Sequence, residues 1–460
     1  MRQDITKRLL PAILVSLVLV LASTVLPVAA ADPRVLASWS ASGPGIAIHG
    51  DEVYVTEWDQ CRVRVFNATG GFLREWGTEG SGDGQFIRPF AIAAGPDGTV
   101  YVTDWVNNRV QAFNATGGFL AKWGGTGTEN GQFNYPTGVA VDAAGNVYVA
   151  DNGNHRVQKF NATGGFLAKW GRNGGDGTYG SGDGQFFFPM DIAVGPGGAV
   201  CVADSSNHRV QVFDENGGFL AKWGTLGAGD GQFNSPYGIA VDGAGNVYVS
   251  ELVNHRVQVF DATGGFLAKW GTSGTEPGQF YQPEKMAFDS AGQVYVNDKQ
   301  RVQAFAAPVL ARFSANVTGG SAPLAVRFTD GSTNGPTTWS WAFGDGATAD
   351  VRNPVHVYAS PGTYTVNLTA VYGAETDTRT KPGFITVVQP VPGAPAAPTD
   401  TDGDGLYDDV NGNDRADFAD VVLYFNLMTW IDGNQPVSAF DYNANGRIDF
   451  ADVVWLFNRL

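Results

Sequence analysis

The sequence has 460 residues and carries 45 acidic against 29 basic side chains, which gives a formal net charge of −16. Much of this excess lies in residues 400–460, which hold 12 acidic and 3 basic side chains. An acidic chain repels the phosphate backbone at physiological salt, so nucleic acid is a poor candidate partner.

Residues 1–31 have the pattern of a signal peptide. Three basic residues precede an apolar run from Leu9 to Val28, which is followed by the small residues Ala29 and Ala30. This pattern is typical of an export signal, so we expect the segment to be cleaved and the chain to be secreted. The alternative is retention as a membrane anchor, because the run approaches the length that spans a bilayer. No second long apolar stretch follows.

Residues 32–307 repeat one unit. Segments of this unit end in tryptophans that stand 47 residues apart, with one interval of 53, namely Trp76, Trp123, Trp170, Trp223 and Trp270. Each unit contains four short runs separated by glycine and asparagine turns, such as GVAVD, NVYVAD, HRVQKF and GFLAKW in residues 138–170. Alternation within the runs has period two, so each unit predicts a four-stranded blade of a β-propeller. Six Arg-Val pairs predict six blades.

The sixth unit lacks its outer strand, whereas Val35–Trp39 stands alone before the first unit. We predict that this N-terminal strand completes the sixth blade and closes the ring, which removes exposed strand edges.

The units resemble NHL repeats, whose VYVAD..NHRVQVF pattern occurs almost unchanged at 147–160 and 247–260. The resemblance implies a six-bladed propeller that recognises a partner at one rim of its channel. Some NHL propellers bind RNA through a basic face, and the acidic composition here opposes that. Cys61 and Cys201 fall on blades expected to face each other across the ring, so we expect unpaired thiols that serve packing.

Some six-bladed propellers are metal-dependent lyases or lactonases, so catalysis is an alternative. His155, His208 and His255 recur in consecutive blades and should lie roughly 10 Å apart, too far to share one zinc ion. His49 is placed where a strand can face the channel, but it has no second inward histidine. An acid ends each second strand, at Glu57, Asp104, Asp151, Asp204, Glu251 and Asp298. We interpret these acids as ion-pair partners of the arginine in the same blade, with an acidic collar for a cation or sugar as the alternative.

Five glycosylation sequons begin at Asn67, Asn114, Asn161, Asn316 and Asn367. The first three occupy the same hairpin of successive blades. Glycosylation there would decorate one flank of the disc, but NATGG is also favourable turn chemistry, and the sequence leaves both interpretations open.

Residues 308–389 resemble a PKD domain, on the strings WSWAFGDG at 339–346 and NPVHVY with PGTYTV at 353–366. The resemblance implies an immunoglobulin-like sandwich that acts as a spacer. We expect Trp341, Phe343 and Tyr364 in its core. Residues 390–399 are rich in proline and predict an extended, semi-rigid linker.

Residues 400–460 predict a calcium-binding module. In 441–452, oxygen side chains at positions 1, 3, 5, 9 and 12, glycine at 6 and a main-chain carbonyl at 7 match a calcium loop: Asp441, Asn443, Asn445, Arg447, Asp449 and Asp452. A second copy has aspartate instead of glycine at position 6 and comprises Asp409, Asn411, Asn413, Arg415, Asp417 and Asp420. A further acidic string lies upstream and comprises Asp400, Asp402, Asp404 and Asp408. It either binds another ion or is a solvated acidic segment.

Each calcium loop runs into an amphipathic helix, at 418–428 and 450–460. A loop followed by a helix, repeated twice, resembles a dockerin, the calcium module that docks onto a cohesin receptor. Phe418-Ala419 and Phe450-Ala451 replace the small hydroxyl residues common in cellulosomal dockerins, which leaves the class of receptor open. We expect calcium removal to unfold this module and spare the propeller.

The sequence therefore predicts a mainly β protein with a six-bladed propeller, a sandwich and a small α-helical calcium module. The combination resembles archaeal surface-associated proteins. We expect a secreted, non-catalytic binding or scaffold protein whose propeller recognises a protein or glycan. The alternatives are an extracellular enzyme, lyase-like or acting on polysaccharide in the channel, and an architectural envelope component.

Overall fold

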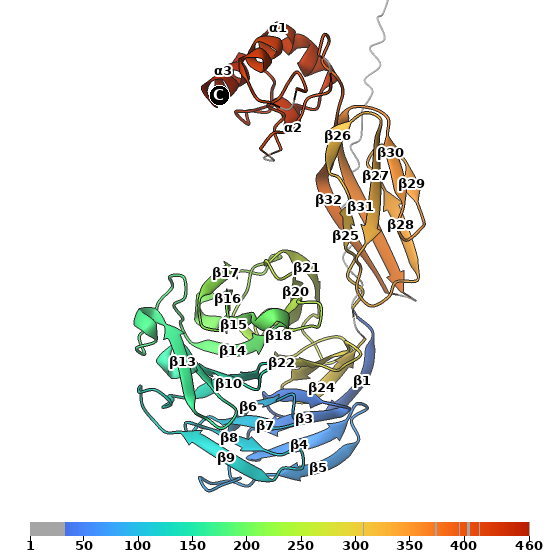
Figure 1. The fold of residues 1–460 in the computed structure, drawn as a ribbon. Coiled ribbons are helices and arrows are strands. Elements are labelled where there is room, and N and C mark those ends of the chain that lie inside the picture. The colour runs from blue at the N-terminus through green and yellow to red at the C-terminus, as the bar shows by residue number, and fades with distance from the viewer. Residues whose placement is uncertain are drawn as a thin grey trace, which may run out of the picture.

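The computed structural model describes residues 33–306, 308–372, 375–394, 396–402, 405–413 and 415–459. The predicted signal segment, Asp404 and Asp414 lie outside the described residues. In Figure 1 a propeller, a middle β-domain and a C-terminal helical module follow one another along the chain. Across the described ranges, no helix has the length and apolar character needed to span a bilayer.

Six four-stranded antiparallel sheets form the propeller within these residues, as predicted. From the channel outward the blades are β2 (Ile46–His49), β3 (Glu52–Glu57), β4 (Arg62–Asn67) and β5 (Phe72–Trp76); β6 (Pro89–Ala94), β7 (Val100–Asp104), β8 (Arg109–Phe113) and β9 (Phe119–Gly124); β10 (Pro136–Val141), β11 (Val147–Asp151), β12 (Arg156–Phe160) and β13 (Phe166–Gly171); β14 (Pro189–Val194), β15 (Val200–Asp204), β16 (Arg209–Phe213) and β17 (Phe219–Trp223); β18 (Pro236–Val241), β19 (Val247–Glu251), β20 (Arg256–Phe260) and β21 (Phe266–Trp270); β22 (Pro283–Phe288), β23 (Val294–Asp298), β24 (Arg301–Phe305) and β1 (Val35–Ser40). Short 3-10 helices lie in the connecting loops: η1 (Asn152–Asn154), η2 (Arg172–Gly174), η3 (Pro196–Gly198) and η4 (Ser205–Asn207).

The N-terminal strand closes the ring. β1 pairs antiparallel with β24, with Trp39 opposite Val302 and Ser40 opposite Arg301, which confirms the prediction. The Trp39 ring packs between the blades so closely that a Cβ on Gly70 of blade one would lie 2.6 Å from it. Trp76 meets the equivalent turn glycine of blade two at the same distance. The tryptophans of the repeat are therefore inter-blade wedges, and β1 supplies the wedge that joins the last blade to the first.

An ion pair recurs in all six blades, and in blades two to six its arginine also donates to carbonyls of the loop that enters the blade. The acid that ends the second strand contacts the arginine that opens the third, at 2.5–3.2 Å, in the pairs Glu57–Arg62, Asp104–Arg109, Asp151–Arg156, Asp204–Arg209, Glu251–Arg256 and Asp298–Arg301. Arg156 also donates to the carbonyls of Glu129 and Gln132 at 3.0 and 2.9 Å. These contacts confirm the ion-pair interpretation, and the buried acids do not form an open collar.

Cys61 and Cys201 are buried and unpaired, as predicted. The three repeated histidines have left-handed backbone conformations before their third strands. The Nδ1 atoms of His155 and His208 accept hydrogen bonds from Phe188 and Ser235 of the following blades at 3.1 and 3.3 Å. These two histidines therefore link neighbouring blades.

Two sheets with a shared core make up the middle domain. One sheet has the order β25-β27-β30 and the other β26-β32-β31-β28-β29. Their bounds are β25 (Phe313–Ala315), β26 (Gly319–Ser321), β27 (Leu324–Asp330), β28 (Thr338–Ala342), β29 (Thr348–Ala349), β30 (Val355–Tyr358), β31 (Gly362–Tyr372) and β32 (Glu375–Val388). Trp341 and Phe343 are buried in this core, as expected, whereas Tyr364 is only half-buried and its hydroxyl donates to the Ser360 carbonyl at 2.8 Å.

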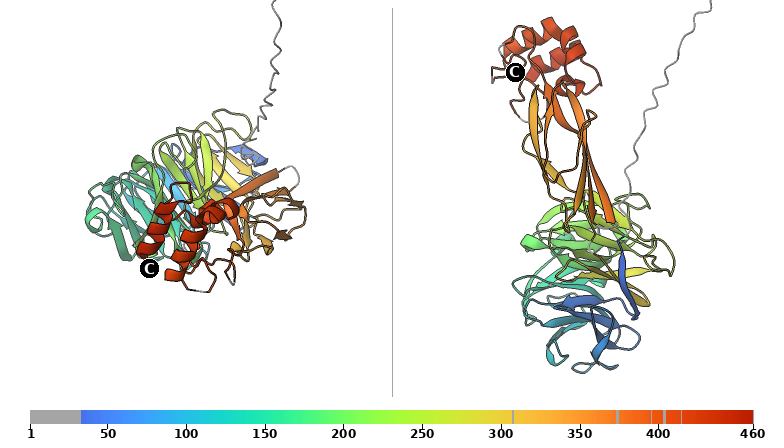
Figure 2. Two further views of the ribbon diagram at one scale, coloured as in Figure 1. Left: turned by 90° about the horizontal axis from the view of Figure 1, so that it is seen from above. Right: turned by 90° about the vertical axis from the view of Figure 1, so that its right-hand side faces the viewer.

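The middle domain contacts the propeller at blade five. Arg312 donates to Asn246, which lies in the turn between β18 and β19, and Arg379 donates to the Phe266 carbonyl at 3.4 Å. Leu310 is buried in the core that blades five and six share. Figure 2 shows the middle domain standing between the propeller and the helical module.

The C-terminal module consists of α1 (Phe418–Asn434), α2 (Val437–Phe440) and α3 (Phe450–Arg459), with α1 and α3 side by side. The proline-rich stretch before it differs from the expected linker. Val391 and Ala397 are buried in the core of the module, and Thr399 forms two main-chain hydrogen bonds with Asp409. Val391, Ala394 and Ala397 are thus packed against the module rather than free, because their apolar side chains supply part of a small core.

Candidate functional site

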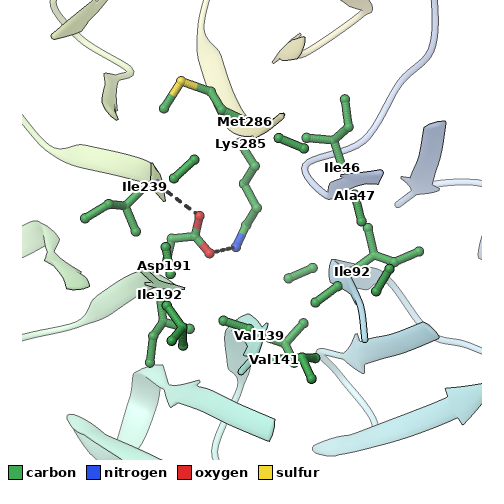
Figure 3. Close-up of a pocket in the computed structure, with 18 of the residues that line it drawn as sticks. Ile46, Ala47, Ile92, Val139, Val141, Asp191, Ile192, Ile239, Lys285 and Met286 are labelled. Carbon is green, nitrogen blue, oxygen red and sulfur yellow. Dashed lines mark hydrogen bonds and ion pairs between the residues drawn. The ribbon is translucent and has the colours of Figure 1, made fainter. Parts of the chain in front are cut away.

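The inner strands surround a channel of about 240 Å³ lined mainly by aliphatic side chains (Figure 3). One position of the inner-strand repeat is glycine or alanine in four blades, at Gly45, Ala91, Gly138 and Gly238. In blades four and six the same position holds Asp191 and Lys285. Their side chains meet across the channel in an ion pair, and Figure 3 shows it spanning the opening. The pair breaks the symmetry of the ring.

Burial dominates the electrostatics of this pair. It raises the pKa of Asp191 and lowers that of Lys285, while the opposite charge of the partner acts against both shifts. Asp191 also accepts a hydrogen bond from the Ile239 main chain at 3.1 Å, and the Lys285 ammonium lies 5.4 Å from the centre of the Phe90 ring. These contacts hold both charges in place, so we interpret the pair as structural. We call the Asp191–Lys285 pair, which spans the channel at its mouth, the floor.

A second cavity, of about 320 Å³, lies at one mouth of the channel. The residues that precede the floor position in each inner strand surround this mouth: Pro44, Phe90, Thr137, Met190, Tyr237 and Glu284. Pro44, Phe90, Tyr237 and Glu284 line the cavity together with Trp58, Asp59 and Lys299 from the loops after β3 and β23. We call this cavity the mouth pocket. Its volume is at the lower end of the range for ligand sites, roughly 300–1,000 Å³.

Glu284 is the polar group of the mouth pocket whose bonding is incomplete. Its Oε2 atom is buried and has no hydrogen-bond partner among the described residues. Burial is the main cause that raises its pKa to about 7, with a smaller contribution from Asp298, while Lys299 and Lys285 act in the opposite direction. A half-buried carboxyl group with an unused acceptor is costly unless a ligand completes its hydrogen bonds.

Aromatic rings extend from the mouth pocket across the same face. The centroid distances are 6.1 Å from Tyr237 to Phe90, 5.4 Å from Phe90 to Trp58, 5.1 Å from Trp58 to Trp105 and 4.5 Å from Trp105 to Tyr135. We call these five rings the aromatic row. They come from blades one, two, three and five and from the ends of strands that meet at this face.

His49 does not line the channel with its neighbours on β2. It ends that strand, at the opposite end from the mouth pocket, and its ring lies beside Gly98 of the next blade. No group of three or more histidine, cysteine, aspartate or glutamate side chains with metal-binding geometry occurs in the described parts of the chain.

The two predicted calcium loops have the same local hydrogen bonds. The position 12 carboxylate accepts from the main-chain nitrogens of positions 3 and 9, at 3.1 and 2.7 Å for Asp452 and at 2.9 and 2.7 Å for Asp420. The position 9 carboxylates, on Asp449 and Asp417, accept from the main chain two residues later at 2.8 Å, where α3 and α1 begin. The loop sequence therefore sets the start of each helix.

The position 1 and position 5 residues complete the turns. Asp441 accepts from Asn445 and Gly446 at 3.0 and 2.6 Å, and Asp409 accepts from Gly412 and Asn413 at 2.8 and 3.0 Å. Asn443 donates to Asp452 at 2.8 Å, and Asn411 donates through its main chain to Asp420. The side chains of Arg415 and Arg447 are exposed, which leaves the main-chain carbonyls for the role predicted at position 7.

The donor types of both loops suit a calcium ion, although no three of the described acidic side chains of either loop are grouped as metal ligands in this structure. Asp420 and Asp452 are fully buried, and neither forms a salt bridge with a described residue. Burial, and repulsion by Asp409 and Asp417, raise the pKa of Asp420. Buried carboxylates without a basic partner match the oxygen ligands that a hard cation prefers.

The upstream acidic string does not share this arrangement among its described members. Asp408 accepts from the Thr401 main chain and hydroxyl at 3.0 and 2.9 Å, and Asp400 accepts from the Gly405 main chain at 2.8 Å. Asp402 forms an ion pair with Arg459 in the last turn of α3. The described residues of the string therefore form structural contacts with one another's loop and with α3.

The outer surface of α1 and α3 exposes six large apolar side chains. Phe418, Val422 and Phe425 on α1 are 63, 43 and 53% exposed, and Phe450, Val454 and Phe457 on α3 are 57, 43 and 55% exposed. We call this surface the phenylalanine face. The rings pair crosswise, Phe418 with Phe457 at 6.2 Å and Phe425 with Phe450 at 5.9 Å, which makes the face two-fold symmetric. The helical stripe predicted from sequence is therefore split, with Val421 and Val453 buried.

The five sequon asparagines differ in their surroundings. Asn67, Asn114 and Asn161 are exposed, and their Oδ1 atoms accept from the hairpin main chain, as the turn interpretation expects. Asn316 accepts from the Arg327 main chain at 2.7 Å, and the Asn367 side chain is half-buried on β31.

Two family models match the chain: the NHL repeat at residues 133–160, 186–213 and 233–260, and the PKD domain at residues 305–387. The chain carries NHL repeats followed by a PKD domain. The NHL model covers blades three to five, and the remaining blades follow from the sheet topology. The PKD model coincides with the middle domain.

Two curated proteins of Caenorhabditis elegans resemble short stretches. Protein lin-41 is 52% identical over 46 residues, and the B-box type zinc finger protein ncl-1 is 49% identical over 43 residues. These stretches span 10 and 9% of this chain but only 4 and 5% of the two relatives.

Solved structures with a similar arrangement include a streptogramin B lyase, with 15% identity, 58% of this chain, 96% of that chain and a TM-score of 0.44. A catalytically inactive virginiamycin B lyase of Staphylococcus aureus with quinupristin has 13% identity, 64 and 95% coverage and a TM-score of 0.41. A gluconolactonase of Xanthomonas campestris has 15% identity, 58 and 86% coverage and a TM-score of 0.43.

Sequence reasoning missed the floor and the mouth pocket of the NHL propeller. The signal was present at the position where the repeat has glycine or alanine, because PMDI and PEKM replace it in blades four and six. A departure from the repeat consensus at a channel-lining position marks a site that the ring symmetry does not require.

Proposed function

We propose that this is a secreted binding and scaffold protein, whose C-terminal module attaches it to a receptor while the NHL propeller holds a ligand. The phenylalanine face carries the proposal. Six large apolar side chains on two short helices form a contiguous exposed patch in a highly acidic module, and patches of this kind are typical of protein interaction surfaces.

Calcium would couple the loops to this face. The position 9 aspartates, Asp417 and Asp449, are both expected ligands and the residues from which α1 and α3 begin. A cation bound in each loop would neutralise the buried Asp420 and Asp452 and fix the two helices that bear the phenylalanine face. Attachment is therefore calcium-dependent in this proposal. The resemblance to dockerins supports a cohesin-type receptor as the partner.

Extracellular attachment agrees with the other features of the chain. The predicted signal segment supports secretion, and the combination of modules supports a cell surface of the archaeal type that the sequence resembles. The PKD domain, packed between the propeller and the helical module, supports a spacer role. In this proposal the propeller is non-catalytic, and its asymmetric mouth pocket holds the ligand.

The test is capture from an envelope extract by the full chain, with calcium or with chelator, followed by identification of the captured protein. The wild type should retain a cohesin-like receptor only with calcium. Val422→Asp places a charge in the phenylalanine face and should abolish capture, whereas Asn434→Asp, at the far end of the same helix, should not. Capture that survives both chelation and Val422→Asp contradicts the proposal, and retention of copies of this chain alone favours the architectural alternative.

A further inference from the structure

The mouth pocket has a feature that the ring does not need. Five of the six residues around the mouth are uncharged, and the sixth, Glu284, has a buried oxygen without a partner. Lys299 is close enough to lower its pKa, yet its ammonium donates to Gln282 at 2.8 Å. A carboxyl group kept in this state lowers stability, and such costs concentrate at binding sites.

We propose that the mouth pocket binds one sugar ring of an uncharged glycan chain, with the following sugars lying along the aromatic row. This inference deepens the ligand-binding part of the proposed function and does not depend on the C-terminal module. Three properties of this face favour such a ligand: its local charges, the unused hydrogen-bonding capacity of Glu284, and the length of the aromatic row.

The local charges favour an uncharged ligand. Cations of the protein already lie over the rings of this face: Arg88 is 5.3 Å from the centre of Trp58, Lys285 is 5.4 Å from Phe90, and Lys299 is 5.5 Å from Tyr281. A cationic ligand would approach these three charges and would compete for the same rings. An anionic ligand would meet Glu284 and Asp59, both of which line the pocket. A neutral ligand avoids both penalties.

The hydrogen bonding favours a hydroxyl group. The Glu284 carboxyl requires a partner that donates when the group is ionised and accepts when it is protonated, and its pKa near 7 gives it both states at neutral pH. A hydroxyl group can do either, whereas an ammonium group can only donate. The half-buried rings of Trp58 and Tyr237 then contact the C–H face of a sugar ring.

The aromatic row favours a chain rather than a single small molecule. Beyond the pocket it continues through Trp105 to Tyr135, a residue that is 43% exposed. A cavity of about 320 Å³ is suited to one ring, and further rings would have to lie outside it. Successive aromatic side chains on one surface provide such contacts with little loss of conformational entropy.

The test measures binding of the full chain to soluble polymers by affinity electrophoresis. The neutral probes are a β-1,3-glucan, dextran and galactomannan, and the charged probes are polygalacturonate and polylysine, with a proline-rich peptide as a further competitor. We expect retardation by at least one neutral polymer. Trp58→Ala and Glu284→Met should each weaken it at least tenfold, whereas Leu252→Ala, which changes the residue equivalent to Trp58 in blade five, should leave it unchanged.

A melting curve of each variant checks that the propeller is folded. Binding only to a charged polymer or to the peptide, no binding to any neutral polymer, or equal binding by Trp58→Ala and the wild type would each overturn the inference. The same assay run with chelator, and with Val422→Asp, separates the two proposals. Both treatments should leave glycan binding unchanged. Failure of the wild type to capture a receptor in calcium, with intact glycan binding, removes only the attachment proposal, and calcium-dependent capture without glycan binding removes only the glycan.

Discussion

Replacement of Glu284 by methionine should make the propeller more stable above neutral pH. Methionine occupies the equivalent mouth position in blade four, at Met190, so its volume and character suit the site. Burial raises the pKa of Glu284 from its ordinary value of 4.5 to about 7. The folded state therefore holds a proton that the unfolded state releases between these values, so stability falls as pH rises through this window.

The magnitude follows from the difference between the two pKa values. At about 1.4 kcal/mol for each pH unit, the ionised carboxyl destabilises the fold by about 3 kcal/mol above pH 7 and by almost nothing at pH 4. Glu284→Met removes this cost. For a domain of this size, such a gain corresponds to a rise in melting temperature of roughly 6–12 °C at pH 8.

Calorimetric melting of the full chain at pH 4, 6 and 8 measures this effect. Glu284→Met should match the wild type at pH 4 and exceed it increasingly at pH 6 and 8. Tyr237→Phe is the control, because it changes the same pocket without removing a carboxyl group, and its effect should not depend on pH. An equal shift at pH 4 and 8 for Glu284→Met would refute the reasoning, since the gain would then come from packing.

Three further predictions concern the ring and the C-terminal module. Chelation of calcium should abolish the helical circular dichroism of the module and leave the propeller transition in place, and retention of the helical signal in excess chelator would contradict the calcium assignment. Trp39→Ala should destabilise the propeller by about 3–5 kcal/mol in denaturant unfolding, because it removes the wedge between blades six and one. Arg156→Ala should cost about 3–5 kcal/mol in the same assay, because it leaves the fully buried Asp151 without a counter-charge. The matching change at the partly exposed Arg301 should cost less.

The sequence predicts the blades well because their pattern is repeated. A period near 47 residues, two-residue alternation and turn glycines agree in every unit, and the absence of an outer strand in the last unit indicates the role of Val35–Trp39. The ion pairs are predictable for the same reason, since a residue that recurs in all blades has a structural role that all blades share.

The mouth pocket could not be predicted in this way. Asp191 and Lys285 are 94 residues apart, and the curved packing of blades four to six around the channel brings their side chains together. Glu284 and Trp58 are single departures from the repeat, and the sequence does not reveal that their side chains meet at one mouth. Each carries information about the site because it differs from the consensus.

The helical module shows a second limit of prediction from the sequence. Spacing along 418–425 indicates an apolar stripe, but it does not decide which residues turn inward. Packing buries Val421 and leaves Phe418 and Phe425 exposed, because the neighbouring helix and the proline-rich stretch already fill the small core. Apolar residues dispersed among prolines, such as Val391, carry no periodic signal at all.

The position of the PKD domain on blade five determines which way the mouth pocket opens. Tyr237 is the second residue of β18, whereas Asn246, the contact of Arg312, lies in the turn after β18 ends. The domain is therefore joined to one side of the disc and the pocket lies on the other. If the helical module is tethered to an envelope, the pocket looks away from the cell, toward polymers in the surrounding medium. A large ligand bound in the mouth pocket would then not collide with the PKD domain or the helical module.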